Sequence, residues 1–169
     1  EGSRSAAGAA ATWLTAETLG FGADGLGALM ATTIESRQAF EAAIEEAVPE
    51  ARFLPADSNI ACFSLARPGE ALSLSNARSR AVFDHFQRSP HFAVSKTTLG
   101  ADNAALIVDL LGGHGGYDDR SEGDAGMLVI RCVFMNPYWS DPSVRHDLLP
   151  RFIEELRQAL ADPDEAKAA

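Results

Sequence analysis

The sequence predicts an α/β fold in which an open, mostly antiparallel sheet is covered by helices. Its 169 residues, 46% of them hydrophobic and 22% charged, have the composition of a single globular domain. Apolar side chains recur at helical spacing near both ends of the chain, whereas short apolar runs bounded by turn residues lie between them. The strongest strand signal is the apolar run at residues 127–135. This order of elements favours helices that pack on one face of a sheet.

Residues 1–50 are predicted to form two helices that bridge to another part of the protein. Residues 5–19 are rich in Ala and are followed by glycines, which is typical of a helix whose small side chains allow close packing. Residues 24–48 carry apolar side chains at helical spacing, and Pro49 ends this second helix. The polar positions of the second helix, expected to face solvent, are Glu35, Arg37, Glu41 and Glu45.

Residues 51–161 are predicted to form the small α/β domain, and residues 162–169 a frayed tail. Strand signals come from short apolar runs closed by Gly or Pro, and helix starts from Ser or Asp caps with Pro in the first turn. In chain order the predicted elements are a strand at 60–66, a helix capped by Ser73 or Ser75 and ending near Arg88, a strand at 91–98, a strand at 127–135 and a helix that begins at Asp141.

The charge of the chain argues against nucleic acid or an anionic membrane as its main partner. Fourteen Lys and Arg stand against 24 Asp and Glu, a formal net charge of -10, and either partner would require a basic surface. No apolar run approaches the ~20 residues of a transmembrane helix, and no signal peptide is visible. Cys62 and Cys132 lie in apolar runs, as expected for reduced thiols in the core of a cytoplasmic protein.

Arg131 is the only charged residue in the run 127–135. Alternation along a strand places its side chain on the same face as those of Met127 and Val129. A guanidinium near a core requires a carboxylate or several carbonyl groups, because it cannot lose its charge. Two interpretations follow. Arg131 forms a structural ion pair, or it is a binding residue that holds a ligand carboxylate in a pocket with two parallel hydrogen bonds.

Gly2, Ser3 and Arg4 precede the first helix and form a second candidate site. Backbone amides at the start of a helix, a hydroxyl and a cation together suit an anion. A simple helix cap is the alternative interpretation, because this tripeptide is common.

Residues 100–126 form a long insertion between two strands, which we expect to be a functional lid or a disordered insert. Its glycines match neither dinucleotide nor phosphate-loop spacing, and its acidic residues miss the calcium-loop pattern. The histidines, including His114 in the insertion, show no ligand spacing with the cysteines, so no metal site is predicted. Lys96 is chemically able to form a Schiff base, but nothing near it in the sequence supports that role.

Three segments resemble group II pyridoxal-phosphate-dependent amino-acid decarboxylases. Residues 1–14 (EGSRSAAGAAATWL) resemble the segment that follows the catalytic loop of these enzymes. Residues 59–65 (NIACFSL) are similar to their first small-domain strand, and residues 129–138 (VIRCVFMNPY) to the strand that carries an arginine. The Glu-Gly-Ser start, the long insertion and the Pro-Tyr pair are most similar to bacterial tyrosine decarboxylases. The resemblance extends over nearly the whole chain, apart from the tail and the details of the insertion.

The resemblance implies that residues 1–50 end the large domain of a fold-type-I enzyme and that residues 51–161 are its small domain. It implies that Ser3, with Gly2 and Arg4, binds the phosphate of pyridoxal phosphate in the neighbouring subunit of a homodimer. It implies that Arg131 contacts the substrate carboxylate, and that residues 95–98 lie near the entrance of the active site.

The cofactor lysine and the residues that hold the cofactor ring lie upstream in this family. Because Glu1 is not an initiator methionine, we expect the chain to be the later part of such an enzyme and inactive without its upstream half. The expected activity is decarboxylation of an L-amino acid, most readily an aromatic one. Two alternatives are an aldehyde-lyase of the sphingosine-phosphate lyase kind, which shares the Gly-Ser-Arg segment, and a non-catalytic regulatory or interaction module derived from such an enzyme.

Overall fold

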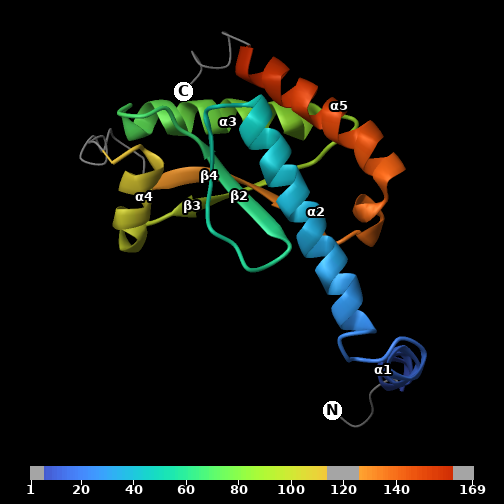
Figure 1. Ribbon diagram of the computed structural model, residues 1–169. Coiled ribbons are helices and arrows are strands. Elements are labelled where there is room, and N and C mark those ends of the chain that lie inside the picture. Colours follow the sequence, from blue (N-terminus) through green and yellow to red (C-terminus); the bar gives the residue numbers. More distant parts are fainter. Residues whose placement is uncertain (1–5, 114–125, 162–169) are drawn as a thin grey trace.

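The protein, described by a computed structural model over residues 6–113 and 126–161, contains an open four-stranded antiparallel sheet with helices packed on it (Figure 1). The predicted α/β class and the antiparallel sheet are confirmed. The strand order is β1-β2-β4-β3, with β1 at Ala51–Phe53, β2 at Ile60–Leu65, β3 at Ser95–Leu99 and β4 at Met127–Val133.

The structure differs from the predicted strands in several places, one of which is the end of β4 at Val133 instead of residue 135. β1 was not predicted, because three residues carry no periodic signal. β3 begins four residues later than expected, because the Ser89 hydroxyl accepts hydrogen bonds from the backbone N–H groups of His91 and Phe92 and holds this segment in a turn.

Three helices cover one face of the sheet: α2 (Leu26–Ala47), α3 (Leu72–Arg88) and α5 (Pro142–Ala161) (Figure 1). Their apolar side chains meet those of the strands in one core, in which Phe40, Phe63 and Phe152 are almost fully buried. The predicted start of α5 is confirmed, since the Asp141 carboxylate accepts the N–H of Ser143 at 2.8 Å.

The predicted cap of α3 was wrong. The helix begins at Leu72, with Ala71 at the cap position and no side-chain cap bond, so both Ser73 and Ser75 lie inside the helix. Ser75 is fully buried. Other groups hold this end of the helix, among them the ion pair between Glu70 and Arg78.

The opposite face of the sheet is covered only in part by the elements that the structure describes. The first part of the insertion forms a short 3-10 helix, η1 (Ala101–Asn103), and then α4 (Ala104–Leu110). α4 packs its side chains on the Met127 and Val129 end of β4. Residues 114–125 of the insertion and the predicted tail at 162–169 lie outside the described residues.

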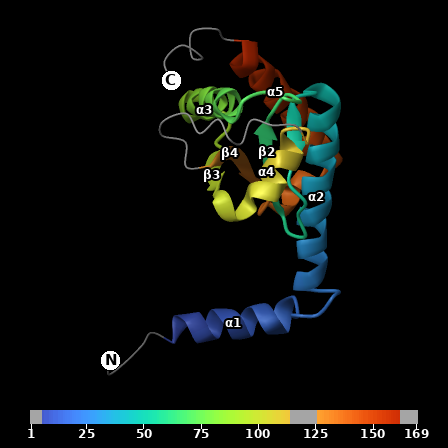
Figure 2. The same ribbon diagram turned by 90° about the vertical axis from the view of Figure 1, so that its left-hand side faces the viewer.

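α1 (Ala7–Thr18) projects away from the sheet and meets the rest of the chain only through the start of α2 (Figures 1 and 2). It contains no buried residue. Large apolar side chains are exposed on α1, on the turn after it and on the first turns of α2: Trp13, Leu14, Leu19, Phe21, Leu29 and Met30. Within the described part of the chain, no helix is both long enough and apolar enough to cross a membrane.

Candidate functional site

A pocket of about 450 Å³ lies on the sheet face opposite α2, α3 and α5, beside the part that α4 covers. We call it the Arg131 pocket. Its floor is made by three strands, and its side wall by the loop between β1 and β2. The lining residues are Leu54, Pro55, Ala56 and Ser58 of the loop, and Ile60, Cys62, Lys96, Thr97 and Arg131 of the strands.

Strand register places Arg131 in this pocket. Arg131 of β4 lies directly opposite Cys62 of β2 and Ser95 of β3, so the three side chains share one face of the sheet. The Ser95 hydroxyl donates a hydrogen bond to the Arg131 carbonyl at 3.1 Å. The backbone that carries the guanidinium is therefore held on both sides by neighbouring strands.

The guanidinium of Arg131 has no ion pair and no side-chain hydrogen bond with any residue that the structure describes. Two other arginines that are partly or fully buried differ: Arg37 pairs with Glu41 at 2.6 Å, and Arg78 with Glu70 at 2.7 Å. A structural ion pair, the simpler of the two interpretations of Arg131, is thus not seen among the described residues. An arginine that lines a pocket in this state is suited to an anionic ligand.

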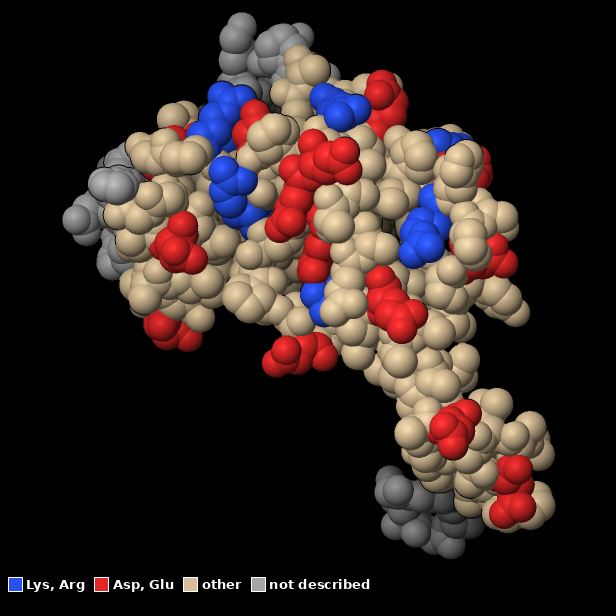
Figure 3. Space-filling model, in the orientation of Figure 1, with Lys and Arg blue, Asp and Glu red and all other residues tan. Residues whose placement is uncertain are grey.

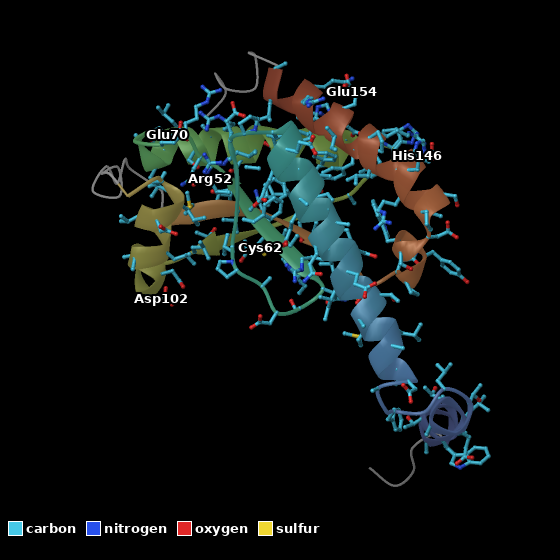
Figure 4. The ribbon with its side chains drawn as sticks, viewed as in Figure 1. Arg52, Cys62, Glu70, Asp102, His146 and Glu154 are labelled. Carbon is cyan, nitrogen blue, oxygen red and sulfur yellow. The ribbon has the colours of Figure 1, made fainter. Side chains whose placement is uncertain are left out.

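Cys62 is the nearest reactive group to Arg131 across the strands, and Figure 4 shows it near the middle of the sheet. Burial raises the pKa of the Cys62 thiol, although the charge of Arg131 acts in the opposite direction. Cys62 is therefore mostly protonated near neutral pH and is no activated nucleophile. Burial raises the pKa of Cys132 to about 12, and this thiol lies on the other face of the sheet.

Lys96 does not present its ammonium group to the Arg131 pocket. It lies opposite Ile130, whose side chain belongs to the helix-covered core, and its Nζ is 4.2 Å from the centre of the Phe83 ring on α3. Lys96 is among the lining residues, and because its side chain is turned toward Phe83, we attribute this to its main-chain atoms. This cation–π contact on the far face makes Lys96 unsuitable as a Schiff-base residue in this pocket.

Arg37 was predicted to face solvent, and this prediction was wrong. Only 6% of Arg37 is exposed. Its guanidinium donates to the carbonyls of Ala56 and Ser58 at 3.0 and 3.2 Å, because the β1–β2 loop folds back against α2. Helical spacing identifies a polar face, but only the tertiary structure shows that a loop covers it.

A second and larger pocket, of about 640 Å³, lies between the end of α3 and α5. Both signs of charge line it, including Arg88, Arg151, Glu154 and Glu155, and His85 lies 3.8 Å from Glu155. Figure 4 shows Glu154 on α5, on the helical side of the molecule. Because charges of both signs line this pocket and favour no single class of ligand, we regard the smaller Arg131 pocket as the better candidate site.

The other predicted site residues cannot be placed. Gly2, Ser3 and Arg4, predicted to bind a phosphate, lie outside the described residues, as does His114. Among the residues that the structure describes, no group of His, Cys, Asp and Glu side chains is arranged to hold a metal ion.

Neither a scan against models of known protein families nor a search of curated proteins finds a match to this chain. The features that bear on function are therefore the Arg131 pocket, the exposed helices and the resemblance carried by the three sequence segments.

Proposed function

We propose that this chain is the carboxyl-terminal part of a pyridoxal-phosphate-dependent decarboxylase of L-amino acids and that it acts in the cytoplasm. The observation that carries the proposal is Arg131, which lines a pocket of about 450 Å³ without an acidic partner among the described residues. The antiparallel sheet with helices on one face agrees with the small domain that the resemblance implies.

In the proposed enzyme, Arg131 binds the carboxylate of the amino-acid substrate with two parallel hydrogen bonds. Leu54, Pro55 and Ile60 add apolar surface beside Arg131, which strengthens the attraction between the two charges once the substrate covers the pocket. The role of this chain is therefore to orient the substrate. The aromatic or aliphatic side chain of the substrate extends beyond the pocket.

The described residues of this chain do not hold the cofactor. Lys96, the only described lysine, is turned toward Phe83 and away from the Arg131 pocket. The cofactor, which when bound supplies an electron sink for the bond that breaks, is accordingly proposed to be carried by the upstream half. Ser3, with Gly2 and Arg4, is proposed to contact its phosphate across the interface of a homodimer.

The exposed apolar side chains on α1 and on the start of α2 favour a surface on which another part of the protein packs. Trp13 and Phe21 are more than half exposed, at 64% and 61%, and α1 buries no residue. Residues 6–36 contain no Lys or Arg, and Figure 3 shows acidic but no basic groups on the projecting part. Such a surface is typical of an element that becomes buried against another part of an assembly. We propose the upstream half of the enzyme as that part.

The test is made on the complex of this chain with the half that carries the cofactor lysine. We expect release of carbon dioxide from aromatic L-amino acids, and a decrease of about 10- to 100-fold in kcat/KM for Arg131→Ala, because charged hydrogen bonds to the substrate are lost. Arg52→Ala is the matched control, since the Arg52 guanidinium on β1 donates to the Pro49 carbonyl, outside the pocket.

Three results contradict the proposal. An Arg131→Ala variant with unchanged kcat/KM removes the substrate-orienting role. An aldehyde product in place of carbon dioxide indicates the aldehyde-lyase reaction. A complex that takes up no pyridoxal phosphate, measured by its visible absorbance, indicates a non-catalytic module.

A further inference from the structure

The side wall of the Arg131 pocket is the loop between β1 and β2, residues 54–59. Ala56 and Ser58 of this loop are among the residues that line the pocket. The position of the loop therefore sets the width of the pocket above the guanidinium of Arg131.

The two ends of the loop are attached to the sheet. The Leu54 N–H donates to the Cys62 carbonyl at 2.9 Å. At the other end, the Asn59 side chain donates to the Phe134 carbonyl at 3.0 Å, and the Phe134 N–H donates to the Asn59 carbonyl at 2.9 Å. These bonds fix the ends of the loop, but they do not hold its middle, which is bound by a different side chain.

Arg37 of α2 holds the middle of the loop. Its Nη2 donates to the Ala56 carbonyl at 3.0 Å and its Nε to the Ser58 carbonyl at 3.2 Å. The loop passes beside α2 in Figure 1, which brings these carbonyls within reach of the helix. Arg37 itself is not among the lining residues, so it acts on the pocket only through the loop.

Glu41, one turn further along α2, neutralises Arg37. Its Oε2 accepts from Arg37 Nη1 at 2.6 Å, whereas its buried Oε1 has no hydrogen-bond partner among the residues that the structure describes. With its charge paired by Glu41, Arg37 keeps its other nitrogens for the two loop carbonyls. The fixed planar fork of a guanidinium suits three acceptors that lie apart, one at each nitrogen, whereas the compact ammonium of a lysine reaches such a spread less well.

We propose that Arg37 is a positioning residue of the Arg131 pocket: it holds the β1–β2 loop at the distance from Arg131 at which a bound carboxylate is enclosed. This inference rests on the proposed carboxylate-binding function of Arg131. Without the two bonds from Arg37, the middle of the loop moves away from the strands, water enters, and Arg131 attracts an anion less strongly.

The test uses Cys62 as a reporter inside the pocket. The purified chain is alkylated at pH 8 with iodoacetate, which carries a carboxylate, and with the neutral iodoacetamide, and modification is located by mass spectrometry. The ratio of the two rates at Cys62 measures the attraction of an anion, because any change in thiolate fraction affects both rates equally. Cys132, with its pKa of about 12, reacts appreciably only if the chain unfolds.

We expect Arg131→Gln to lower the iodoacetate-to-iodoacetamide ratio about fivefold, the effect of one nearby charge. We expect Arg37→Lys to lower the iodoacetate-to-iodoacetamide ratio at least about twofold. Because the loop opens more often, the iodoacetamide rate at Cys62 and the hydrogen exchange of residues 56–58 should both rise at least about threefold. If Arg37→Lys does not fold, the double variant R37Q/E41Q removes both charges together and carries the same test.

Arg157→Lys is the matched control, because Arg157 also donates twice to a backbone carbonyl, that of Ala47, and neither residue lines this pocket. It should leave both rates at Cys62 unchanged. In the complete enzyme, Arg37→Lys should raise KM and leave kcat nearly unchanged, a split that general loss of stability does not produce.

The two proposals fail in different ways. If Arg131→Gln leaves the ratio unchanged, the carboxylate-binding function is wrong. If Arg131→Gln lowers the ratio but a folded Arg37 variant leaves the ratio, the iodoacetamide rate and loop exchange unchanged, Arg37 has no positioning role.

Discussion

Three partly or fully buried arginines, Arg37, Arg78 and Arg131, are treated differently by their surroundings. Arg37 and Arg78 each have a glutamate within 2.7 Å, whereas Arg131 has none among the described residues. The paired arginines hold loops and turns in place, because their charges are already compensated. Arg131, which has no acidic partner among the described residues, is suited to bind an anion, and this contrast is the residue-scale basis of the proposed site.

The pair between Glu70 and Arg78 gives a prediction on stability. Both oxygens of Glu70 accept from Arg78, at 2.7 and 2.8 Å (Glu70 is labelled in Figure 4). We expect Glu70→Gln to lower the free energy of unfolding at pH 7 by about 2 kcal/mol, because charged hydrogen bonds in a partly buried place are lost. Glu50→Gln, at the exposed pair with Arg67, should cost less than about 1 kcal/mol.

The effect of Glu70 depends on pH. Burial acts to raise the pKa of Glu70, but hydrogen bonds from Arg78 and Arg67 outweigh it, and the pKa lies below its ordinary value of 4.5. A lowered folded-state pKa means that the stabilisation is complete above pH 4.5 and is lost as the pH falls through the folded-state value. Urea denaturation from pH 7 to 3 checks this. Equal free energies of unfolding for wild type and Glu70→Gln at pH 7 would contradict the stabilising role of Glu70, and with it the expected pH dependence.

At the scale of elements, the contact between α3 and β4 depends on one polar side chain in the core. Asn76 of α3 is 2% exposed. Its amide donates to the Gly126 carbonyl at 2.9 Å, and its carbonyl accepts from the Leu128 N–H at 2.7 Å. Gly126 is required at this point, because a Cβ there would lie 1.9 Å from the Leu99 carbonyl oxygen. These contacts fix where β4 begins relative to α3.

We therefore expect Asn76→Ala to lower the free energy of unfolding by about 2 to 4 kcal/mol, because it leaves a backbone donor and acceptor buried without partners. Thermal and urea denaturation measure this. Gln87→Ala on the same helix, which loses one longer bond of 3.2 Å to the Val94 carbonyl, is the control and should cost about 1 kcal/mol or less. A loss at Asn76 no larger than that at Gln87 would show that the register of β4 does not depend on this side chain.

At the scale of the whole molecule, the chain consists of a well-packed sheet and helices from which α1 and the first turns of α2 project (Figure 2). α5 and the middle of α2 contribute Phe152, Phe40 and Ile44 to the core, whereas α1 contributes nothing. We therefore expect the stability of the fold and the proposed binding of the upstream half to depend on different parts of the chain.

We expect removal of residues 1–24 to change Tm by less than about 2 °C, because no buried residue of α1 is lost. The same deletion should abolish binding of the upstream half. In a Trp139→Phe variant the remaining Trp13, 64% exposed, should shift its fluorescence to shorter wavelength when that half is added. A large drop in Tm on truncation, or an unchanged Trp13 spectrum in the complex, would contradict this division.

Local patterns in the sequence were sufficient for several features of the fold and the site. Alternation over 127–135 identified the strand and the face that carries Arg131, because side chains alternate along any strand. Asp141 before Pro142 identified the start of α5, because a cap acts within a few residues. The partner of Arg131 was left open, because a charge in a strand is explained equally well by an ion pair or by a ligand.

The sequence by itself determined the α/β class, the start of the last helix and the strand that carries Arg131, because each depends on contacts within about one turn or one strand. Only the tertiary structure decided that the β1–β2 loop covers Arg37, that Cys62 faces Arg131 and that Lys96 turns to Phe83. These contacts join residues 13 to 69 positions apart, and strand register and loop packing are set by the burial of the whole core.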